Sequence, residues 1–313
     1  MAEKIATRES YGSALVELAD KYDFVVLDAD LAEATKTIKF KKAYPDRFFD
    51  CGIAEGNMVS VAAGIATTGK TVFASSFAMF AAGRAFEQVR NSVGYPHLNV
   101  KIGATHAGIT VGEDGATHQC NEDIALMRTI PGMTIVNPSD AVEARAAVEA
   151  ALNTNGPFYL RFGRFAVPVI NDNADYKFEL GKGVCLADGT DVTIVATGLM
   201  VSMALEAREL LANEGISARV VNIHTIKPID RDIIAKAVAD TGAIVTAEEH
   251  NVIGGLGAAV TEVVCETAPA PVGRVGMQDT YGHSGTVPEL LEAYGLTPAA
   301  IVESAKKAIA LKK

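Results

Sequence analysis

Short apolar runs alternate along this chain with longer stretches whose apolar residues recur at the spacing of a helix. In the first half, the runs predict strands at Phe24–Leu27, Phe48–Gly52, Thr71–Ala74, Val100–Ala104, Met133–Val136 and Phe158–Arg161. The stretches between them predict helices at Arg8–Tyr22, Gly56–Thr68, Ala78–Val93, Asp123–Arg128 and Ala141–Asn153. Apolar strands separated by helices indicate a parallel sheet with helices on both of its faces.

The alternation is interrupted by a polar stretch, Val167–Glu179, and then resumes. After the polar stretch, the apolar runs predict strands at Val192–Ala196, Arg219–Asn222, Ile244–Thr246 and Val272–Val275. The helical spacing predicts helices near Val201–Asn213, Arg231–Ala239, Gly257–Thr267 and Pro298–Leu311. We therefore expect an α/β protein of two domains, each an open, mostly parallel sheet with helices on both faces. The expected limits are 1–166 for the first domain, 167–180 for a linker and 181–313 for the second domain.

Composition narrows the class of protein. The 313 residues, 49% of them hydrophobic, are enough for two domains with a core each. The net charge of −10, without any long run of lysine or arginine, argues against a nucleic-acid partner. No apolar run reaches the length of a membrane span, and the four cysteines lack the spacing of metal ligands. We expect a cytoplasmic protein that binds neither nucleic acid nor membrane and carries no metal site of its own.

Polar residues that could carry chemistry follow predicted strands of the first domain. Glu55, His106 and Arg164 each come shortly after such a strand. The carboxyl ends of parallel strands meet at one edge of a sheet, so these side chains are expected to lie close together. The glycine-bracketed loop Gly112–Gln119 can bring the imidazole of His118 to the same edge.

Three segments carry a resemblance to a known family: Gly52–Met58, the block from Thr105-His106 to His118-Gln119, and Thr225–Asp230. With them, the first domain resembles the pyrimidine-binding domain of transketolase, and the second resembles the C-terminal domain of that enzyme. The resemblance covers essentially the whole chain but only the C-terminal half of a full-length transketolase. The chain is thus similar to the C-terminal subunit of a split transketolase. This implies transfer of a two-carbon ketol unit from a ketose to an aldose, in pentose phosphate metabolism.

The resemblance also implies roles for single residues. Glu55 matches the glutamate that contacts the pyrimidine ring of thiamine diphosphate, and Phe77 and Phe80 match aromatic residues that pack on that ring. His118 matches a histidine that lies over the thiazolium and binds substrate hydroxyls, and Asp114 matches a carboxylate that binds a sugar hydroxyl. We expect Glu55 and His118 to be catalytic, since positioned proton transfer is typically worth about 10²–10⁴ in rate. Taken alone, Glu55 could also be an acid favoured in the first turn of a helix.

A further set of matches concerns the acidic end of the substrate. Arg8, His106 and Arg164 match residues that hold the terminal phosphate, a task to which the fork of an arginine is suited. A serine of that set in the family is Ala34 here. Either Thr35 supplies the missing hydroxyl, or the substrate carries another acidic group such as a sulfonate. We expect sugar phosphates as the substrates.

The part of the site that would hold the diphosphate of the cofactor has no counterpart, because no Gly-Asp-Gly run followed by a metal-binding asparagine occurs. The resemblance therefore implies a partner, an N-terminal transketolase subunit that holds the diphosphate and Mg²⁺ or another divalent metal. It further implies an α2β2 heterotetramer.

Three other functions are compatible with the expected fold. The β subunit of a 2-oxo acid dehydrogenase has a similar layout but is not expected to carry the Gly112–Gln119 loop. A 1-deoxy-D-xylulose 5-phosphate synthase usually has the diphosphate half in the same chain and an acid at the position of His106. A regulatory or scaffold chain could keep the fold alone, but the presence of Glu55 and His118 disfavours it. Transketolase is therefore the favoured interpretation.

Overall fold

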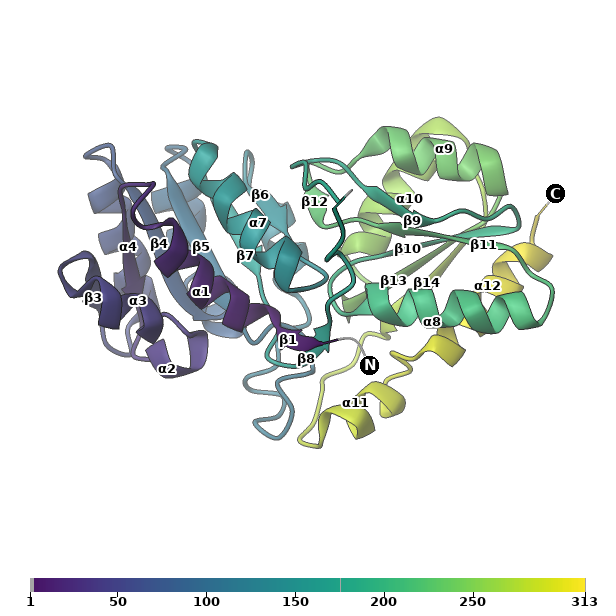
Figure 1. Ribbon diagram of the computed structural model, residues 1–313, viewed down its shortest axis with the longest axis horizontal. Coiled ribbons are helices and arrows are strands. Elements are labelled where there is room, and N and C mark those ends of the chain that lie inside the picture. The colour runs from purple at the N-terminus through teal and green to yellow at the C-terminus, as the bar shows by residue number, and fades with distance from the viewer. Residues whose placement is uncertain (1–2, 175, 313) are drawn as a thin grey trace.

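The computed structural model describes residues 3–174 and 176–312. Within them, the strands form a seven-stranded sheet, a five-stranded sheet and a two-stranded ribbon, with helices against both larger sheets (Figure 1). Residues 1–2, 175 and 313, one of which falls in the predicted linker, lie outside the described residues. Among the described helices, none combines the length and the apolar character needed to cross a membrane.

The first sheet has the strand order β12-β6-β7-β5-β4-β2-β3. Every pair in it is parallel except β12 with β6. The strands are β2 (Phe24–Asp28), β3 (Phe48–Asp50), β4 (Thr71–Phe77), β5 (Val100–Thr105), β6 (Thr134–Val136), β7 (Phe158–Arg161) and β12 (Thr225–Lys227). The prediction of a mostly parallel sheet from the apolar runs is confirmed.

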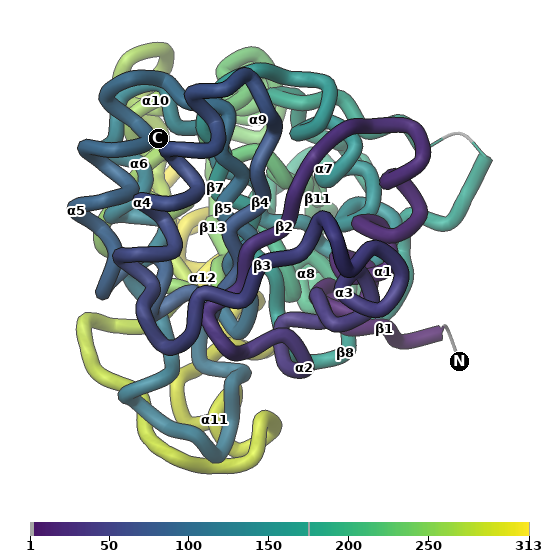
Figure 2. The backbone as a smooth tube through the Cα atoms, turned by 90° about the vertical axis from the view of Figure 1, so that its left-hand side faces the viewer, coloured from purple at the N-terminus to yellow at the C-terminus, as the bar shows by residue number. Residues whose placement is uncertain are grey.

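Helices cover both faces of this sheet because its strands are apolar on both sides. In β2, Phe24 and Val26 belong to an aromatic-rich core on one face, whereas Val25 and Leu27 belong to the core on the other face. Figure 2 shows the two helical layers on either side of the strands. One layer holds α1 (Thr7–Leu18), α3 (Ile38–Ala43) and α7 (Ala141–Asn153), and the other holds α4 (Glu55–Ala66) and α6 (Asp123–Arg128).

The single helix predicted over Ala78–Val93 is replaced by three short pieces. The wide turns of a π-helix form η2 (Met79–Arg84) and η3 (Val89–Gly94), with a short α5 (Phe86–Gln88) between them. Single-turn π segments are rare and occur often at functional sites. Here the wider turn changes which side chains share a face, and η2 begins directly after β4 at the sheet edge where the site residues were expected.

The second sheet has the order β14-β13-β10-β11-β9, with only β9 antiparallel to its neighbour. The strands are β9 (Val184–Ala187), β10 (Val192–Ala196), β11 (Ala218–Asn222), β13 (Ile244–Asn251) and β14 (Val272–Met277). One face is covered by α8 (Met200–Asn213) and α12 (Pro298–Ala310), and the other by α9 (Arg231–Thr241) and α10 (Leu256–Thr267) (Figure 1). The predicted two-sheet α/β fold is confirmed.

Two strand pairings cross the predicted domain limits. The β12 strand lies in the 181–313 range but forms an edge of the first sheet, where Lys227 Nζ donates to the carbonyls of Arg128 and Ile130 at 2.8 and 2.6 Å. The ribbon pairs β1 (Lys4–Ala6) with β8 (Ala166–Pro168). The limits 1–166, 167–180 and 181–313 stay a prediction. Short elements that the pattern did not predict are α2 (Ala32–Thr35), η1 (Pro45–Arg47) and α11 (Val287–Ala293).

Candidate functional site

Glu55 is the first residue of α4, and only 2% of it is exposed. A carboxylate is favoured there because the first turn of a helix carries the positive end of the dipole. The chain reaches this position from β3 through Gly52, whose φ of +67° suits glycine. Both Glu55 oxygens accept a hydrogen bond from Nη1 of Arg84, at 3.0 and 2.9 Å. The buried acid is thus held by an arginine that the sequence analysis did not single out.

An aromatic platform lies beside this acid. Phe77 ends β4 and Phe80 is in η2, and their rings stack with centroids 5.8 Å apart. The imidazole of His118 approaches both rings edge-on, with centroid distances of 5.4 Å to Phe80 and 6.3 Å to Phe77. The structure therefore brings together three residues that the sequence analysis assigned to the cofactor and the substrate.

His106 extends this platform. Its ring stacks on Phe77 with the centroids 3.7 Å apart, and its backbone has a φ of +56°, which is uncommon for a residue other than glycine. Nε2 lies 2.8 Å from Nη1 of Arg8, and Nδ1 lies 2.9 Å from Oγ1 of Thr105. An arginine can only donate, so Nε2 is the acceptor and the proton of the neutral ring is on Nδ1.

Positive charge gathers around His106. Burial, and after it the charges of Arg8, Arg164 and Lys36, lower the pKa of His106 to about 3. Nε of Arg8 is buried and has no hydrogen-bond partner among the described residues. Arg164 donates to the carbonyl of Val111. Several cations around a neutral imidazole, with one donor left unpaired, form a site suited to an anion.

The loop after β2 carries Lys36, one of these cations. Asp28 accepts hydrogen bonds from Leu31 N, from Thr35 Oγ1 and from Thr37 Oγ1 at 2.7, 2.7 and 2.9 Å. Burial raises the pKa of Asp28 to about 6. The hydroxyl of Thr35 is therefore committed to Asp28, which removes it as a substitute for the serine that Ala34 replaces.

The same loop places Ala34 and Lys36 beside α1. Nη1 of Arg8 donates to the Ala34 carbonyl at 3.0 Å. Lys36 follows with a φ of +72° and fits against Gly12, where an added Cβ would lie 2.4 Å from the Lys36 carbonyl oxygen. The Lys36 ammonium pairs with Glu9 at 3.0 Å. Ala34, which lacks the serine hydroxyl of the family, is thus followed two residues later by a lysine whose charge acts on His106.

The Gly112–Gln119 loop closes the opposite side of the site. Asp114 is half-exposed and lies 3.9 Å from Nη1 of Arg164. Gln119 Nε2 donates to the carbonyl of His283 at 2.9 Å, which holds the loop against the segment before α11. Every site residue expected from the sequence lies in the first domain, and the motifs did not indicate this contact with the second domain.

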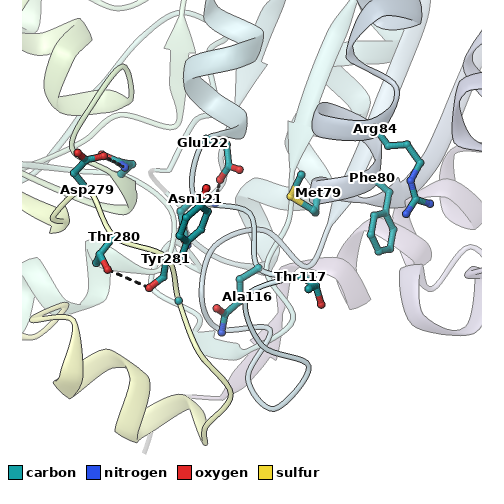
Figure 3. Close-up of a pocket in the computed structure, with 13 residues that line it drawn as sticks. Met79, Phe80, Arg84, Ala116, Thr117, Asn121, Glu122, Asp279, Thr280 and Tyr281 are labelled. Carbon is teal, nitrogen blue, oxygen red and sulfur yellow. Dashed lines mark hydrogen bonds between the residues drawn. The ribbon is translucent and has the colours of Figure 1, made fainter.

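The contact between these loops forms a cleft of about 660 Å³ (Figure 3). Its walls carry Phe80 and Arg84 from η2, Thr117 from the loop, and Asp279 and Tyr281 from the second domain. The signal that could have revealed the second wall is the glycine-rich stretch after β14, at 279–285. The cleft therefore lies between segments that follow strands of the first sheet and a segment that follows β14 of the second sheet.

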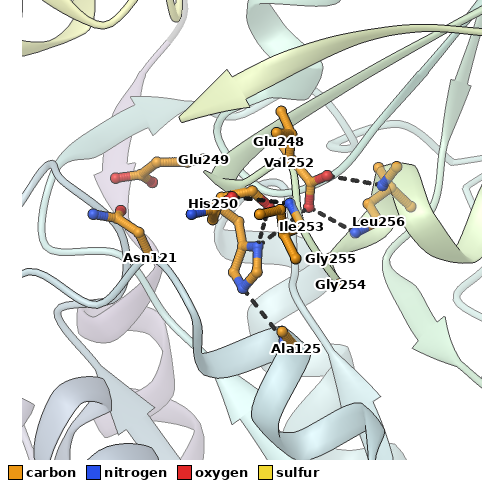
Figure 4. A network of polar contacts seen from close by, with 12 residues as sticks. Asn121, Ala125, Glu248, Glu249, His250, Val252, Ile253, Gly254, Gly255 and Leu256 are labelled. Atoms are coloured by element: carbon orange, nitrogen blue, oxygen red, sulfur yellow. Dashed lines mark hydrogen bonds and ion pairs between the residues drawn. The ribbon is translucent and has the colours of Figure 1, made fainter. Parts of the chain in front are cut away.

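A buried polar network joins the two sheets, and Figure 4 shows the part of it around Glu249 and His250. Arg161 at the end of β7 pairs with Asp123 at 2.8 Å and donates to the carbonyl of Glu249 at 2.9 Å. The Glu249 carboxylate accepts from the backbone N–H of Thr110 at 2.8 Å, and Nε2 of His250 accepts from a backbone N–H of α6. These contacts position the loop that carries the site residues, and they give His250 a structural role.

The fold and the geometry define a class of site: a buried acid and an aromatic platform for a flat heterocycle, next to a cationic site for an anion. Residues 3–169 match the transketolase pyrimidine-binding domain, and residues 181–301 match the transketolase C-terminal domain. The chain belongs to the transketolase family, as the resemblance of its motifs predicted.

Similar proteins agree with this assignment. The chain is 51% identical to a Methanocaldococcus jannaschii protein provisionally named a transketolase C-terminal section, over 95% of this chain and 94% of that protein. It is 46% identical to a 6-deoxy-6-sulfo-D-fructose transketolase subunit of a Clostridium species, over 95% of this chain and 92% of that protein. A solved split-gene transketolase, described as an inactive β4 tetramer, superposes with a TM-score of 0.91 at 53% identity. That match covers 99% of this chain and 100% of the solved chain.

Membership of this family implies dependence on thiamine diphosphate. The site fits the pyrimidine end of that cofactor, because the Glu55 carboxylate can accept a proton from a ring nitrogen and Phe80 offers a face for stacking. Among residues 3–174 and 176–312, no three His, Cys, Asp or Glu side chains are grouped so that they could hold a metal ion.

Proposed function

We propose that this chain is the C-terminal subunit of a thiamine diphosphate-dependent transketolase. With an N-terminal-section partner, it transfers a two-carbon ketol unit from a ketose phosphate to an aldose phosphate. The observation that carries the proposal is the contact of His106 with both Phe77 and Arg8, because it joins the aromatic platform directly to the cationic site. A substrate could therefore reach from the cofactor to an anion site along one continuous surface.

Each residue has a defined task in this proposal. Glu55 holds and exchanges a proton with a nitrogen of the pyrimidine ring, and Phe77 and Phe80 orient that ring. Thiamine diphosphate, when bound, supplies the electron sink for the transferred carbon unit. His118 and Asp114 bind substrate hydroxyls, and His118 can pass protons to the substrate carbonyl oxygen.

The cationic site binds the acidic terminus of the substrate. Arg8 and Arg164 provide guanidinium donors, and Lys36 adds a third positive charge near them. Phosphate and sulfonate are both tetrahedral oxyanions, and one relative is named for a sulfosugar, which supports comparing the two anions. We propose phosphate as the main substrate group, with the Ala34 position as the place where a different anion would be accommodated.

The partner chain would complete the site. It would hold the diphosphate and Mg²⁺ or another divalent metal, in an α2β2 heterotetramer. Ile53, two residues before Glu55, is 76% exposed, and Tyr281 on the cleft is 88% exposed. Apolar side chains this accessible favour burial against another chain. The solved relative described as an inactive β4 tetramer supports the need for a second kind of chain.

The test is reconstitution. This chain, its N-terminal-section partner, and the mixture of both are supplied with thiamine diphosphate and Mg²⁺ and assayed with xylulose 5-phosphate and ribose 5-phosphate. We expect sedoheptulose 7-phosphate from the mixture only. Product formed by this chain alone would contradict the need for a partner. No product from an assembled mixture, with phosphorylated or sulfonated sugars, would contradict the function.

A further inference from the structure

Arg84 makes two specific contacts at the cleft. Nη1 donates to both oxygens of Glu55 at 2.9 and 3.0 Å, and the guanidinium carbon lies 4.5 Å from the ring centroid of Phe80. The side chain of Glu55 is 2% exposed, whereas that of Arg84 is 54% exposed. A buried carboxylate is thus compensated by a cation that reaches it from the solvent side.

These contacts are the ones that a flat heterocycle would make in the same place. A guanidinium is planar, carries N–H donors in its plane and stacks on aromatic rings. A pyrimidine ring bound here would offer a protonated ring nitrogen to Glu55 and a flat face to Phe80. Arg84 and the ring therefore require the same carboxylate and the same aromatic surface.

We propose that Arg84 is an internal placeholder for the pyrimidine ring. In the cofactor-free chain it pairs with Glu55 and covers Phe80, and it withdraws when the ring binds. This inference rests on the proposed function, because thiamine diphosphate is the source of the ring.

The position of Arg84 allows the exchange. It is the last residue of the π-helix η2, and it lines the cleft of about 660 Å³ (Figure 3). Within the described part of the chain, its guanidinium makes no hydrogen bond other than those to Glu55. Its release therefore breaks one ion pair and one stacking contact, and the ring replaces both.

The placeholder has opposite effects on two measurable quantities. It protects the cofactor-free chain, because a buried carboxylate without a partner is costly. It weakens cofactor binding, because the ring has to displace it. Replacing Arg84 should therefore lower the thermal stability of the cofactor-free protein and, at the same time, tighten the binding of thiamine diphosphate.

The experiment uses the complex of this chain with its N-terminal-section partner, titrated with thiamine diphosphate in the presence of Mg²⁺ by calorimetry. Arg84→Met should lower the Kd for thiamine diphosphate about tenfold and lower the Tm of the cofactor-free complex. Arg90→Met is the matched control, since Arg90 is exposed on η3 and hydrogen-bonded only to its neighbour Asn91 in the described residues. Both quantities should stay at wild-type values in this control.

A second variant covers the case in which Arg84→Met does not assemble. Arg84→Lys keeps a charge for Glu55 but loses the planar stack on Phe80, so it should lower the Kd by a smaller factor. An unchanged Kd in the Arg84 variants would overturn the proposal, and so would a raised Kd, which would make Arg84 part of the bound site. If the wild-type complex binds the cofactor and transfers ketol units in either of these cases, the proposed function stands without the placeholder. Absence of cofactor binding by the wild-type complex would overturn both.

Discussion

Arg8 donates a hydrogen bond to Nε2 of His106 at 2.8 Å, and this one contact links the start of α1 to the end of β5. It fixes the tautomer of the imidazole, whose ring stacks on Phe77. The remaining Nε donor of Arg8 is buried without a partner among the described residues. The pair therefore acts as one preformed unit that presents a positive charge and no negative charge to a ligand.

His106 should remain neutral across the physiological range. Its pKa is about 3 because burial and the neighbouring cations Arg8 and Arg164 disfavour the protonated ring. Since the folded protein holds the neutral form at every pH above that value, the ¹⁵N shifts of the His106 ring should not change between pH 5 and 8. The Arg8→Met variant should move the titration upward. A wild-type inflection between pH 5 and 8 would contradict the lowered pKa of His106.

Glu55→Gln should lower the turnover of the reconstituted enzyme about 10²-fold or more, because an amide cannot cycle a proton. Folding and assembly should survive, since the amide oxygen still accepts from Arg84. The measurement is kcat at saturating cofactor, with the exposed Glu87→Gln as the control variant. Near-normal turnover would remove Glu55 from the mechanism.

Arg164→Ala should raise the KM for ribose 5-phosphate about tenfold or more, because one charge-assisted contact to the phosphate is lost. The KM for unphosphorylated ribose should change little, so the preference of the wild type for the phosphorylated sugar should shrink. Arg231→Ala serves as the control, since Arg231 pairs only with Glu266 on the second domain among the described residues. A wild-type enzyme without preference for the phosphorylated sugar would contradict the assignment of this cationic site.

Glu249 should make folding stability depend on pH. Burial raises the pKa of Glu249 from 4.5 to about 7, so the folded chain keeps the proton longer than the unfolded chain. The contribution is fully present below pH 4.5 and is lost as pH rises through 7, with a magnitude of up to about 3 kcal/mol. The Tm of Glu249→Gln should therefore exceed that of the wild type by an amount that grows from pH 5 to 7.5. Gln can still accept from Thr110, so a constant difference would mean that Glu249 does not titrate in this window.

Much of the fold and part of the site could be predicted from the sequence. Strands buried on both faces need unbroken apolar runs, and these runs marked the strands of both sheets. Glu55, His106 and His118 lie in contiguous motifs, so their identity was visible without coordinates. The break in the predicted helix over 78–93 was not visible, because η2 and η3 pack against α4 and local periodicity does not report contacts with another segment.

Only the tertiary structure decided which distant residues meet. Arg84 contacts Glu55 although 29 positions separate them in the chain. Lys36 lies near enough for its charge to act on His106, because a hydrogen bond from Thr35 to Asp28 holds the loop that carries Lys36. The 279–285 segment forms the second wall of the cleft, and β12 joins a sheet built from the other half of the chain. A sequence pattern reports local periodicity and burial. The order of strands in a sheet and the pairing of charged side chains depend instead on contacts between segments far apart in the chain, and these contacts exist only once the sheets have formed.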